Sequence, residues 1–234
     1  MYMRIILLIA ILLNVSVHAD TIMLSFNQGE AVQDVSVLLV KEIYNRAGMT
    51  PKITPFPAAR ATRLILTNEL DGESARIELY FKDKPYLLKV EPSFYYLKTT
   101  AFALKRRNIQ INSSDDLKEY NVGILRGVVH SADATQLAKK LYLSNSVDQL
   151  FKMLELGRID VVVDGELNGK LSLKKLNIDS ISAVGLLAKR DFFHVLHPSQ
   201  SDLVDKISKS IHELKETGKL KSLIAKFEKQ VLTL

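Results

Sequence analysis

The sequence predicts an α/β fold made of two related lobes, and three observations support this. The 234 residues are 47% hydrophobic, enough to bury the core of one domain or of two small lobes. Short apolar segments alternate with segments of helical periodicity, which is typical of a parallel sheet covered by helices. A unit of helix, tight turn and strand also occurs twice, as LILTNELDG over 64–72 and as MLELGRID over 153–160. Two related lobes explain this repeat, and chance similarity of two such units is the alternative.

The first part of the chain alternates strand and helix. Alternating hydrophobicity over 21–26 predicts a strand that ends in a turn. Apolar residues at helical spacing predict a helix over 35–47, which ends at Gly48. An extended segment over 50–56 and a helix over 58–68 follow. The order β-α-β-α is the expected start of a parallel sheet.

The rest of the chain continues this pattern. The stretch 159–163 is apolar almost throughout, which is typical of a parallel strand with both faces buried. The other predicted strands lie at 99–104, 121–125 and 181–188. Helices are predicted around Leu117, from about Ala132 onward, and over 146–156. Two Lys-rich helices are predicted within 202–232, separated near Gly218.

The first residues predict export from the cytoplasm. Arg4 precedes an unbroken apolar run over 5–13, and Val17-His18-Ala19 offers modest side chains where a signal peptidase cleaves. The run is shorter than the roughly 20 residues that a membrane-spanning helix needs. We therefore expect residues 1–19 to be a cleaved signal peptide of a Gram-negative periplasmic protein; an uncleaved anchor is the alternative.

Composition narrows the function classes. The chain contains no Cys, so an exported form has no disulfides and must be stabilised by its core. The net charge of +6 comes from Lys and Arg interspersed with Asp and Glu, which indicates solvated helix faces. A basic stripe interleaved with aromatic residues is absent, so we expect no nucleic-acid partner. Motifs for phosphate, dinucleotide or serine-nucleophile chemistry are absent, and the His spacing does not suggest a metal, so no cofactor is expected.

Three motifs, in order along the chain, give the sequence a family resemblance. They are NVGILRG at 121–127, LGRIDVVVD at 156–164 and LKETGKL at 214–220. With them the chain resembles the periplasmic solute-binding proteins of family 3, the amino-acid-binding type of ABC transporters. The resemblance covers essentially all of the chain after residue 19.

The resemblance implies a two-lobed periplasmic binding protein-like (type II) fold with a central cleft and two hinge crossings. Lobe 1 would comprise residues 20–104 plus 187–234, and lobe 2 would comprise residues 105–186. The crossings would be 101–105 and 183–189, where Ala-Val-Gly suits a hinge.

The sequence departs from the family pattern near residue 76. Amino-acid binders of this family carry an Arg in a Thr-x-x-Arg pattern, shortly before an aromatic-Ser-x-Pro-Tyr stretch. Here Asp71-Gly72-Glu73-Ser74-Ala75-Arg76 is followed by Ile77-Glu78-Leu79-Tyr80. The sequence looks more like a divergent branch of small proteobacterial binding-type proteins.

Candidate ligand contacts in lobe 1 centre on two arginines. Arg76 follows a strand end, where open α/β sheets bind ligands, and it could grip a carboxylate through two hydrogen bonds; a salt bridge to Glu73 or Glu78 is the alternative. Arg60 lies at a helix N-terminus, where its charge is unfavourable unless an anion is near. The candidates in this lobe are Phe26, Asn27, Arg60, Gly72, Glu73, Arg76 and Tyr95.

Candidate contacts in lobe 2 come from two strand ends. The segment after the strand 121–125 leads into a helix N-terminus, where backbone N–H groups are ready donors to an anion. From this segment we expect Arg126, Gly127, Val128 and His130 to contact ligand. The resemblance places a carboxylate that pairs with a ligand ammonium at Asp164; an Asp-Gly turn is the alternative.

The sequence thus predicts a monomeric periplasmic solute-binding protein rather than an enzyme. It would close two lobes around a small polar, amino-acid-like or anionic ligand and serve an ABC permease or a membrane sensor. A periplasmic enzyme of the same fold, dehydratase-like, is one alternative, with Glu73, Asp164 and Glu166 as the carboxylates to suspect. A signalling module that has lost its ligand is the other.

Overall fold

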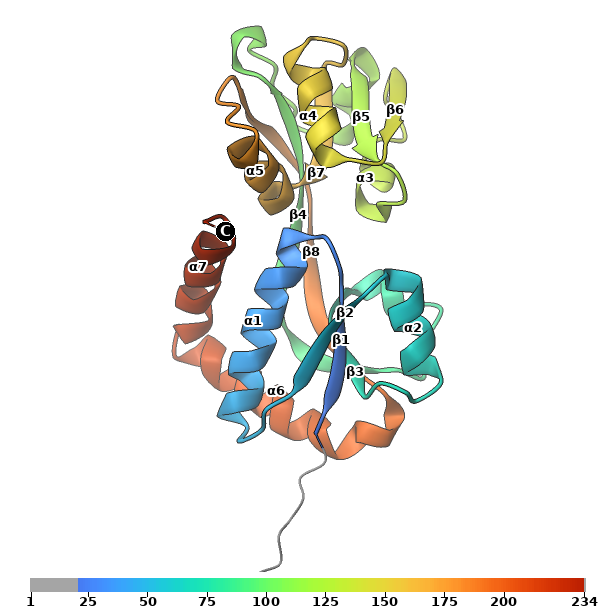
Figure 1. Cartoon of the computed structure of the whole chain (residues 1–234), viewed down its shortest axis with the longest axis vertical. Helices are drawn as coiled ribbons and strands as arrows, with labels where there is room; N and C mark the ends of the chain where they lie inside the picture. The colour runs from blue at the N-terminus through green and yellow to red at the C-terminus, as the bar shows by residue number, and fades with distance from the viewer. Residues whose placement is uncertain (1–20, 234) are drawn as a thin grey trace, which may run out of the picture.

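The computed structural model describes residues 21–233 and shows a two-lobed α/β protein (Figure 1). Its strands form one hydrogen-bonded sheet of eight strands in the order β2-β1-β3-β8-β4-β7-β5-β6. The predicted fold class is confirmed. The predicted signal peptide, residues 1–19, lies outside the described residues. Within residues 21–233, no helix is long and apolar enough to cross a membrane.

The elements alternate along the chain, as the periodicity of the sequence predicts. The strands are β1 (Met23–Asn27), β2 (Lys52–Phe56), β3 (Gly72–Ile77), β4 (Leu88–Leu104), β5 (Asn121–Leu125), β6 (Lys140–Ser144), β7 (Val161–Gly165) and β8 (Ile181–Leu196). The α-helices are α1 (Ala31–Arg46), α2 (Ala58–Leu66), α3 (Val129–Ala134), α4 (Val147–Glu155), α5 (Glu166–Lys175), α6 (Val204–Glu216) and α7 (Lys219–Val231). Short 3-10 helices are η1 (Glu78–Phe81), η2 (Lys105–Arg107), η3 (Ser114–Glu119) and η4 (Pro198–Leu203).

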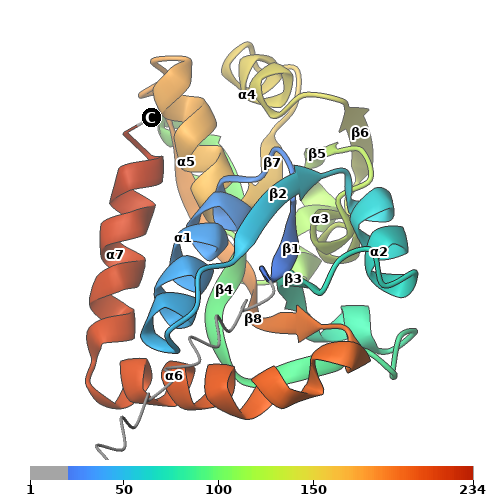
Figure 2. The ribbon, with the colours of Figure 1, turned by 60° about the horizontal axis from the view of Figure 1, so that its bottom comes forward.

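Lobe 1 is built on the half of the sheet that holds β1, β2 and β3. These three strands are parallel, and β8 joins β3 in the antiparallel direction. Helices α1, α6 and α7 cover one face through a large apolar cluster that includes Leu39, Ile211 and Phe227 (Figure 2). Helix α2 covers the other face through Leu64 and Ile65. The strands contribute Leu24 and Ala75 to the first cluster and Val195 to the second.

Lobe 2 repeats this plan on β7, β5 and β6. The three strands are parallel to one another, and β7 pairs with β4 in the antiparallel direction. On one face α4 and α5 pack against β4, where Phe151 meets Phe102 edge to face. On the other face Leu117, Ile111 and Ala134 form the second cluster. Gly169 of α5 allows this close packing, since a Cβ there would lie 2.4 Å from the ring of Phe102.

The repeated unit of the sequence is a structural repeat. The side chain of Asp71 accepts a hydrogen bond of 2.6 Å from the backbone N–H of Met23, at the start of β1. The side chain of Asp160 accepts the corresponding bond of 2.9 Å from Asn121, at the start of β5. In each lobe an Asp thus fastens the beginning of the neighbouring parallel strand. The two lobes thus share this feature of the predicted repeat, and Asp71 is a structural residue.

Two long strands connect the lobes. Strands β4 and β8 pair with each other from Leu88–Leu196 to Leu104–Ile181. Within the described chain, Leu97 and Lys98 of β4 pair with β8 alone, at Arg190 and Lys189, because β3 leaves β8 at Phe192 and β7 joins β4 at Thr99. This short two-stranded stretch lies between the lobes in Figure 1. The lobe boundaries and crossings given above stay predictions.

Gly185, part of the Ala-Val-Gly segment that suits a hinge, has a packing role. A Cβ at this position would lie 1.9 Å from the carbonyl oxygen of Ile111, whose backbone N–H donates to Val184 at 3.0 Å. The glycine therefore permits the chain around Ile111 to approach the edge of β8.

Candidate ligand-binding site between the lobes

The carboxyl ends of the parallel strands of both lobes face the junction between the lobes. This is where open α/β sheets place their ligand sites. A cavity of about 280 Å³ lies there, with Leu97 and Phe192 of the connecting strands in its wall. From lobe 1 it is lined by Glu30, Gln33, Ala58, Arg76, Ile77, Leu79, Tyr80, Asp83 and Lys84. From lobe 2 it is lined by Gly127, Val128, Val129 and His130. We call it the interlobe cavity.

Arg76 reaches the interlobe cavity as one half of a buried ion pair. Its Nη2 lies 2.6 Å from Oε1 of Glu73, and the Glu73 side chain is fully buried. The two residues lie on one strand at a register shift between β3 and β8, which lets both side chains turn to the same side. The alternative role predicted for Arg76 from the sequence, a salt bridge to Glu73, is therefore present in the structure. Burial raises the pKa of Glu73, and the nearby Arg76 only partly offsets this.

Tyr80 holds this pair against the cavity wall. The guanidinium carbon of Arg76 lies 4.5 Å from the centre of the Tyr80 ring, and Nζ of Lys84 lies 4.5 Å from the same centre. The ring is fixed in turn by its hydroxyl, which donates a 3.1 Å bond to Thr62 of α2. Two cations near one aromatic ring give this part of the wall a positive character.

Asp164 is a buried carboxyl group on the lobe 2 side of the junction. It lies at the end of β7 opposite Thr100 of β4 and is 1% exposed. Among the described residues, neither oxygen of its carboxylate has a hydrogen-bond partner, and neither does Oγ1 of Thr100. Burial raises the pKa of Asp164 to about 7; the Gly165 N–H, which is close to the carboxylate but does not meet hydrogen-bond geometry, lowers it in part, and the carboxylate of Glu30 raises it by a smaller amount. Such a group is costly to ionise without a positive partner.

Glu30 carries the corresponding negative group on lobe 1. It precedes α1 and lines the interlobe cavity. Burial raises the pKa of Glu30, and Arg76 lowers it in part. Glu30 lines the cavity, and Glu73 and Asp164 are buried outside its lining. Arg76 lowers the pKa of both lobe 1 carboxylates in part, and Lys84 adds to this at Glu73. The surplus of buried carboxylates favours a positive group on whatever occupies the cavity.

His130 adds a neutral polar group. Nδ1 of its ring lies 3.0 Å from the hydroxyl of Thr99, and the side chain is buried under the cavity wall. Burial, together with the nearby charge of Arg190, lowers the pKa of His130 to about 4. The ring is therefore uncharged at neutral pH and can act as a hydrogen-bonding group. His194 is likewise neutral, but Tyr44 and the carbonyl of Ser74 hold it in the lobe 1 core.

The structure brings part of the predicted set together. Arg76, Gly127, Val128 and His130 line the interlobe cavity. Glu73 and Asp164 are buried beside it, and Asn27 ends β1 with an amide oxygen that is buried and has no partner within residues 21–233. The ligand-binding role of these residues stays a prediction.

The remaining predicted residues lie elsewhere. Arg60 is exposed on α2, with its guanidinium carbon 5.2 Å from the centre of the Phe56 ring. Tyr95 is buried, and its hydroxyl donates a 2.9 Å bond to Glu228 of α7. Arg126 is exposed, and its Nε donates a 3.2 Å bond to Asn145. Phe26 lies in β1 and is half-buried. These four do not line the interlobe cavity.

Gly72 has no space for a ligand. It is buried where β3 begins, paired with Leu24 on one side and Leu196 on the other. A Cβ there would lie 2.2 Å from the carbonyl oxygen of Val195. The expectation of a ligand contact is therefore corrected: this glycine allows strand packing.

Gly72→Ala is expected to destabilise the protein by about 3 kcal/mol, since a backbone carbonyl must move to admit one methyl group. Urea unfolding followed by circular dichroism measures this. Gly48→Ala is the matched control, because its positive φ of +77° costs about 1 kcal/mol while the space around it is open. Equal losses in the two variants would contradict the packing role of Gly72.

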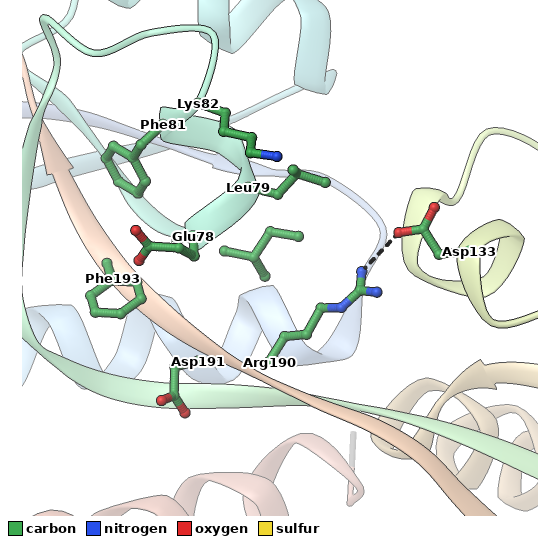
Figure 3. A pocket seen from close by; sticks show the side chains of 9 residues that line it. Glu78, Leu79, Phe81, Lys82, Asp133, Arg190, Asp191 and Phe193 are labelled. Atoms are coloured by element: carbon green, nitrogen blue, oxygen red, sulfur yellow. Dashed lines mark hydrogen bonds and ion pairs between the residues drawn. The ribbon is translucent and has the colours of Figure 1, made fainter. Parts of the chain in front are cut away.

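A second, larger cavity of about 870 Å³ adjoins the first (Figure 3). Both cavities share Ile77 and Leu79. In the second, Arg190 of β8 points to Asp133 of α3, and their side chains form a 3.2 Å ion pair between the connecting strand and lobe 2. Its other charged groups, Glu78, Lys82 and Asp191, are exposed. The buried polar groups belong to the first cavity, which we therefore take as the candidate site.

Sequence reasoning missed several residues of this site, namely Glu30, Gln33, Tyr80, Lys84 and Thr100. Glu30 lies in the predicted first turn and Thr100 lies inside a predicted strand, so only their tertiary positions distinguish them. Tyr80 carried a weak signal, since an aromatic residue four positions after Arg76 is near enough to stack on it.

No group of three or more His, Cys, Asp or Glu side chains in the described part of the chain has an arrangement that could hold a metal ion. The chemistry available at the interlobe cavity is therefore that of buried carboxylates, one paired guanidinium, a neutral imidazole and aromatic surface.

Two α/β lobes joined by two long strands, with a cavity between them, define the two-lobed periplasmic-binding-protein-like (type II) fold. The sequence matches no protein-family model and no curated protein sequence.

Solved structures of this fold include both transport and sensor proteins. A histidine kinase sensor domain with similarity to periplasmic binding proteins has a TM-score of 0.69 and 16% identity, with 89% of this chain and 96% of that chain covered. The amino acid ABC transporter substrate-binding protein AbpA from Streptococcus pneumoniae, bound to L-arginine, has a TM-score of 0.68 and 16% identity, covering 91% and 96%. The GluR0 ligand-binding core in complex with L-glutamate has a TM-score of 0.72 and 13% identity, covering 92% and 99%.

Proposed function

We propose that this protein is a periplasmic binding protein that encloses a small amino-acid-like ligand between its lobes. The observation that carries the proposal is Asp164, a fully buried carboxylate whose oxygens lack a partner within residues 21–233 and whose neighbour across the lobes is another carboxylate, Glu30. A ligand ammonium placed between them would satisfy both groups and offset the cost of burying Asp164.

The proposal specifies the charge of the ligand more closely than the sequence does. A zwitterionic or cationic amino acid matches the buried carboxylates, and its own carboxylate would approach Arg76 and Lys84 near Tyr80. A dianion would add negative charge to a site whose carboxylates already have raised pKa values. We therefore expect cationic and neutral amino acids to bind and dicarboxylates to fail.

We further propose delivery to an ABC permease or a membrane sensor, with the protein a monomer exported by residues 1–19. The similarity in fold to both an importer component and a sensor domain supports these two roles equally. The proteobacterial origin belongs to the same proposal.

A thermal-shift panel tests the proposed ligand class. Arginine, ornithine, glutamine, glutamate and succinate would each be added over a range of concentrations. A ligand at about 100 times its Kd stabilises by about 2.7 kcal/mol, which raises the Tm by about 5–10 °C for a protein of this size. If no amino acid raises the Tm, the proposal fails; if only succinate does, the inferred charge of the ligand is wrong.

A dehydratase-like enzyme is the second candidate, because burial raises the pKa of Asp164 to about 7, where a carboxylic acid can donate a proton at neutral pH. Incubation of the protein with each stabilising compound, followed by mass spectrometry, distinguishes the two candidates. Loss of 18 mass units from the compound would favour the enzyme, and an unchanged compound would favour the binding protein.

A further inference from the structure

Helix α5 belongs to lobe 2 by its packing but also makes the principal contacts with lobe 1. Leu173 lies in the lobe 2 core, Gly169 packs on Phe102, and Ser172 donates a 2.7 Å hydrogen bond to Asp148 of α4. These bonds and contacts fix α5 to its own lobe. In Figure 1 the lower end of α5 lies next to the upper end of α1 and the C-terminal end of α7.

The opposite face of α5 packs into lobe 1. Leu167 is 9% exposed and lies in the apolar cluster of lobe 1, and Leu171 packs against that cluster. One turn further on, Nζ of Lys174 donates a 2.6 Å bond to the carbonyl oxygen of Leu232, just after α7. The spacing of positions 167, 171 and 174 places them on one helix face. A side chain of one lobe is thus part of the hydrophobic core of the other.

Asn168 extends this contact to the start of α1. The residue before α1, Glu30, makes no side-chain hydrogen bond to the helix start within the described chain. Instead, Oδ1 of Asn168 accepts a 2.8 Å hydrogen bond from the backbone N–H of Ala31. An amide oxygen at this place satisfies one of the helix N–H groups that has no partner inside the helix. Lobe 2 therefore caps a helix of lobe 1.

We propose that α5 is an interlobe latch, in which Leu167 and Leu171 bind the core of lobe 1 while Asn168 caps α1. We call the arrangement with these contacts closed; it then depends on contacts between the lobes as well as on a ligand. Because the apparent affinity scales with the fraction of molecules in the binding-competent arrangement, the latch sets the ligand affinity without touching the ligand.

The latch is tested by measuring the distance between the lobes. The chain has no Cys, so Lys41→Cys on α1 and Lys152→Cys on α4, both at exposed positions, allow a single pair of spin labels. Pulsed electron-electron double resonance on the full chain, with no solute added, then gives the distribution of interlobe distances. Leu167→Ala is expected to raise the ratio of open to closed molecules by about tenfold or more, because it removes a side chain buried across the junction.

Two further variants keep the test decisive. Leu173→Ala is the matched control, since Leu173 is equally buried on the same helix but in the core of lobe 2. It is expected to lower the Tm and leave the distances unchanged. Asn168→Ala is expected to raise the ratio of open to closed molecules by about two- to tenfold, because it removes one hydrogen bond. The proposal would be overturned if Leu167→Ala and Asn168→Ala gave the same interlobe distances as the parent. It would also be overturned if Leu173→Ala opened the lobes as much as Leu167→Ala does. None of these outcomes depends on the identity of the ligand.

Discussion

Asp164→Asn is expected to stabilise the protein when no ligand is present and to weaken ligand binding by about 100-fold or more. The first effect follows from burial: the pKa of Asp164 is raised to about 7 from 3.8, so ionisation of this group at higher pH costs the folded state up to about 4 kcal/mol. Asparagine fills nearly the same volume without a charge. The second effect follows because the variant removes the negative partner of the proposed ligand ammonium.

The pH dependence of this gain has a definite sign. Because the folded pKa of Asp164 lies above the unfolded value, its contribution to stability is complete below pH 3.8 and is lost as the pH rises through 7. The advantage of Asp164→Asn over the parent should therefore be near zero at pH 4, grow through pH 5 and 6, and level off above pH 7. Urea unfolding at these pH values measures it.

Asp160→Asn is the matched control for this experiment. Asp160 bonds to Arg107 and to the backbone of Asn121, and these bonds lower its pKa despite partial burial. The same chemical change should therefore destabilise the protein by about 1 kcal/mol at neutral pH. If Asp164→Asn also lowered the stability at pH 8, Asp164 would have a partner in solution. The proposed function would then lose its main support.

Arg76→Met is expected to destabilise the protein by about 3–5 kcal/mol at pH 8. It leaves Glu73 fully buried without its counter-ion, and an uncompensated buried charge costs far more than the loss of a surface pair. In the variant Glu73 can escape this cost by binding a proton, so the loss should be smaller at pH 5 than at pH 8. Chemical unfolding at both pH values provides the measurement.

The double variant Glu73→Gln/Arg76→Met tests the cause. It removes both charges, and we expect it to recover most of the stability that Arg76→Met alone loses. Arg63→Met is the control for loss of an exposed arginine, since its pair with Glu69 at 3.6 Å is exposed; its effect should stay within about 0.5 kcal/mol. If the double variant is as unstable as Arg76→Met, the role of Arg76 is packing against Tyr80 and not charge compensation.

The ion pair also bears on the ligand. Glu73 already occupies the guanidinium of Arg76, so a ligand carboxylate must share Arg76 with it or approach Lys84. This agrees with the departure of the sequence from the family pattern around residue 76. The simplest consequence is that the protein would recognise a ligand mainly through the cationic group of that ligand.

The sequence by itself determined the two-lobed α/β plan. Apolar runs such as 159–163, the glycine stop at residue 48 and the repeated Asp at 71 and 160 are local signals, and local hydrogen bonding and periodicity decide what they form. It also identified the strand ends that reach the cavity, because parallel strands of one sheet end at the same edge.

Two elements could not be found in this way. Strand β6 is an edge strand with Leu141 and Leu143 exposed, so it lacks the pattern of a buried strand. Helix α5 contains Asn168-Gly169 in its first turn, a pair typical of turns, and its glycine is needed where Phe102 packs against the helix. In both cases a neighbouring element stabilises a segment whose own sequence gives little indication of its structure.

Only the tertiary structure decided the character of the site. That Asp164 is buried opposite Glu30 and that Asn168 caps a helix of the other lobe are relations between the two lobes. The pair of Glu73 and Arg76 is local in the chain, but its burial is set by the elements packed around β3. Burial and pairing set the free energy of a charged group, and both depend on neighbours that the sequence does not order in space. The sequence determines which charges are available, and the packing of the two lobes determines which of them are left for a ligand.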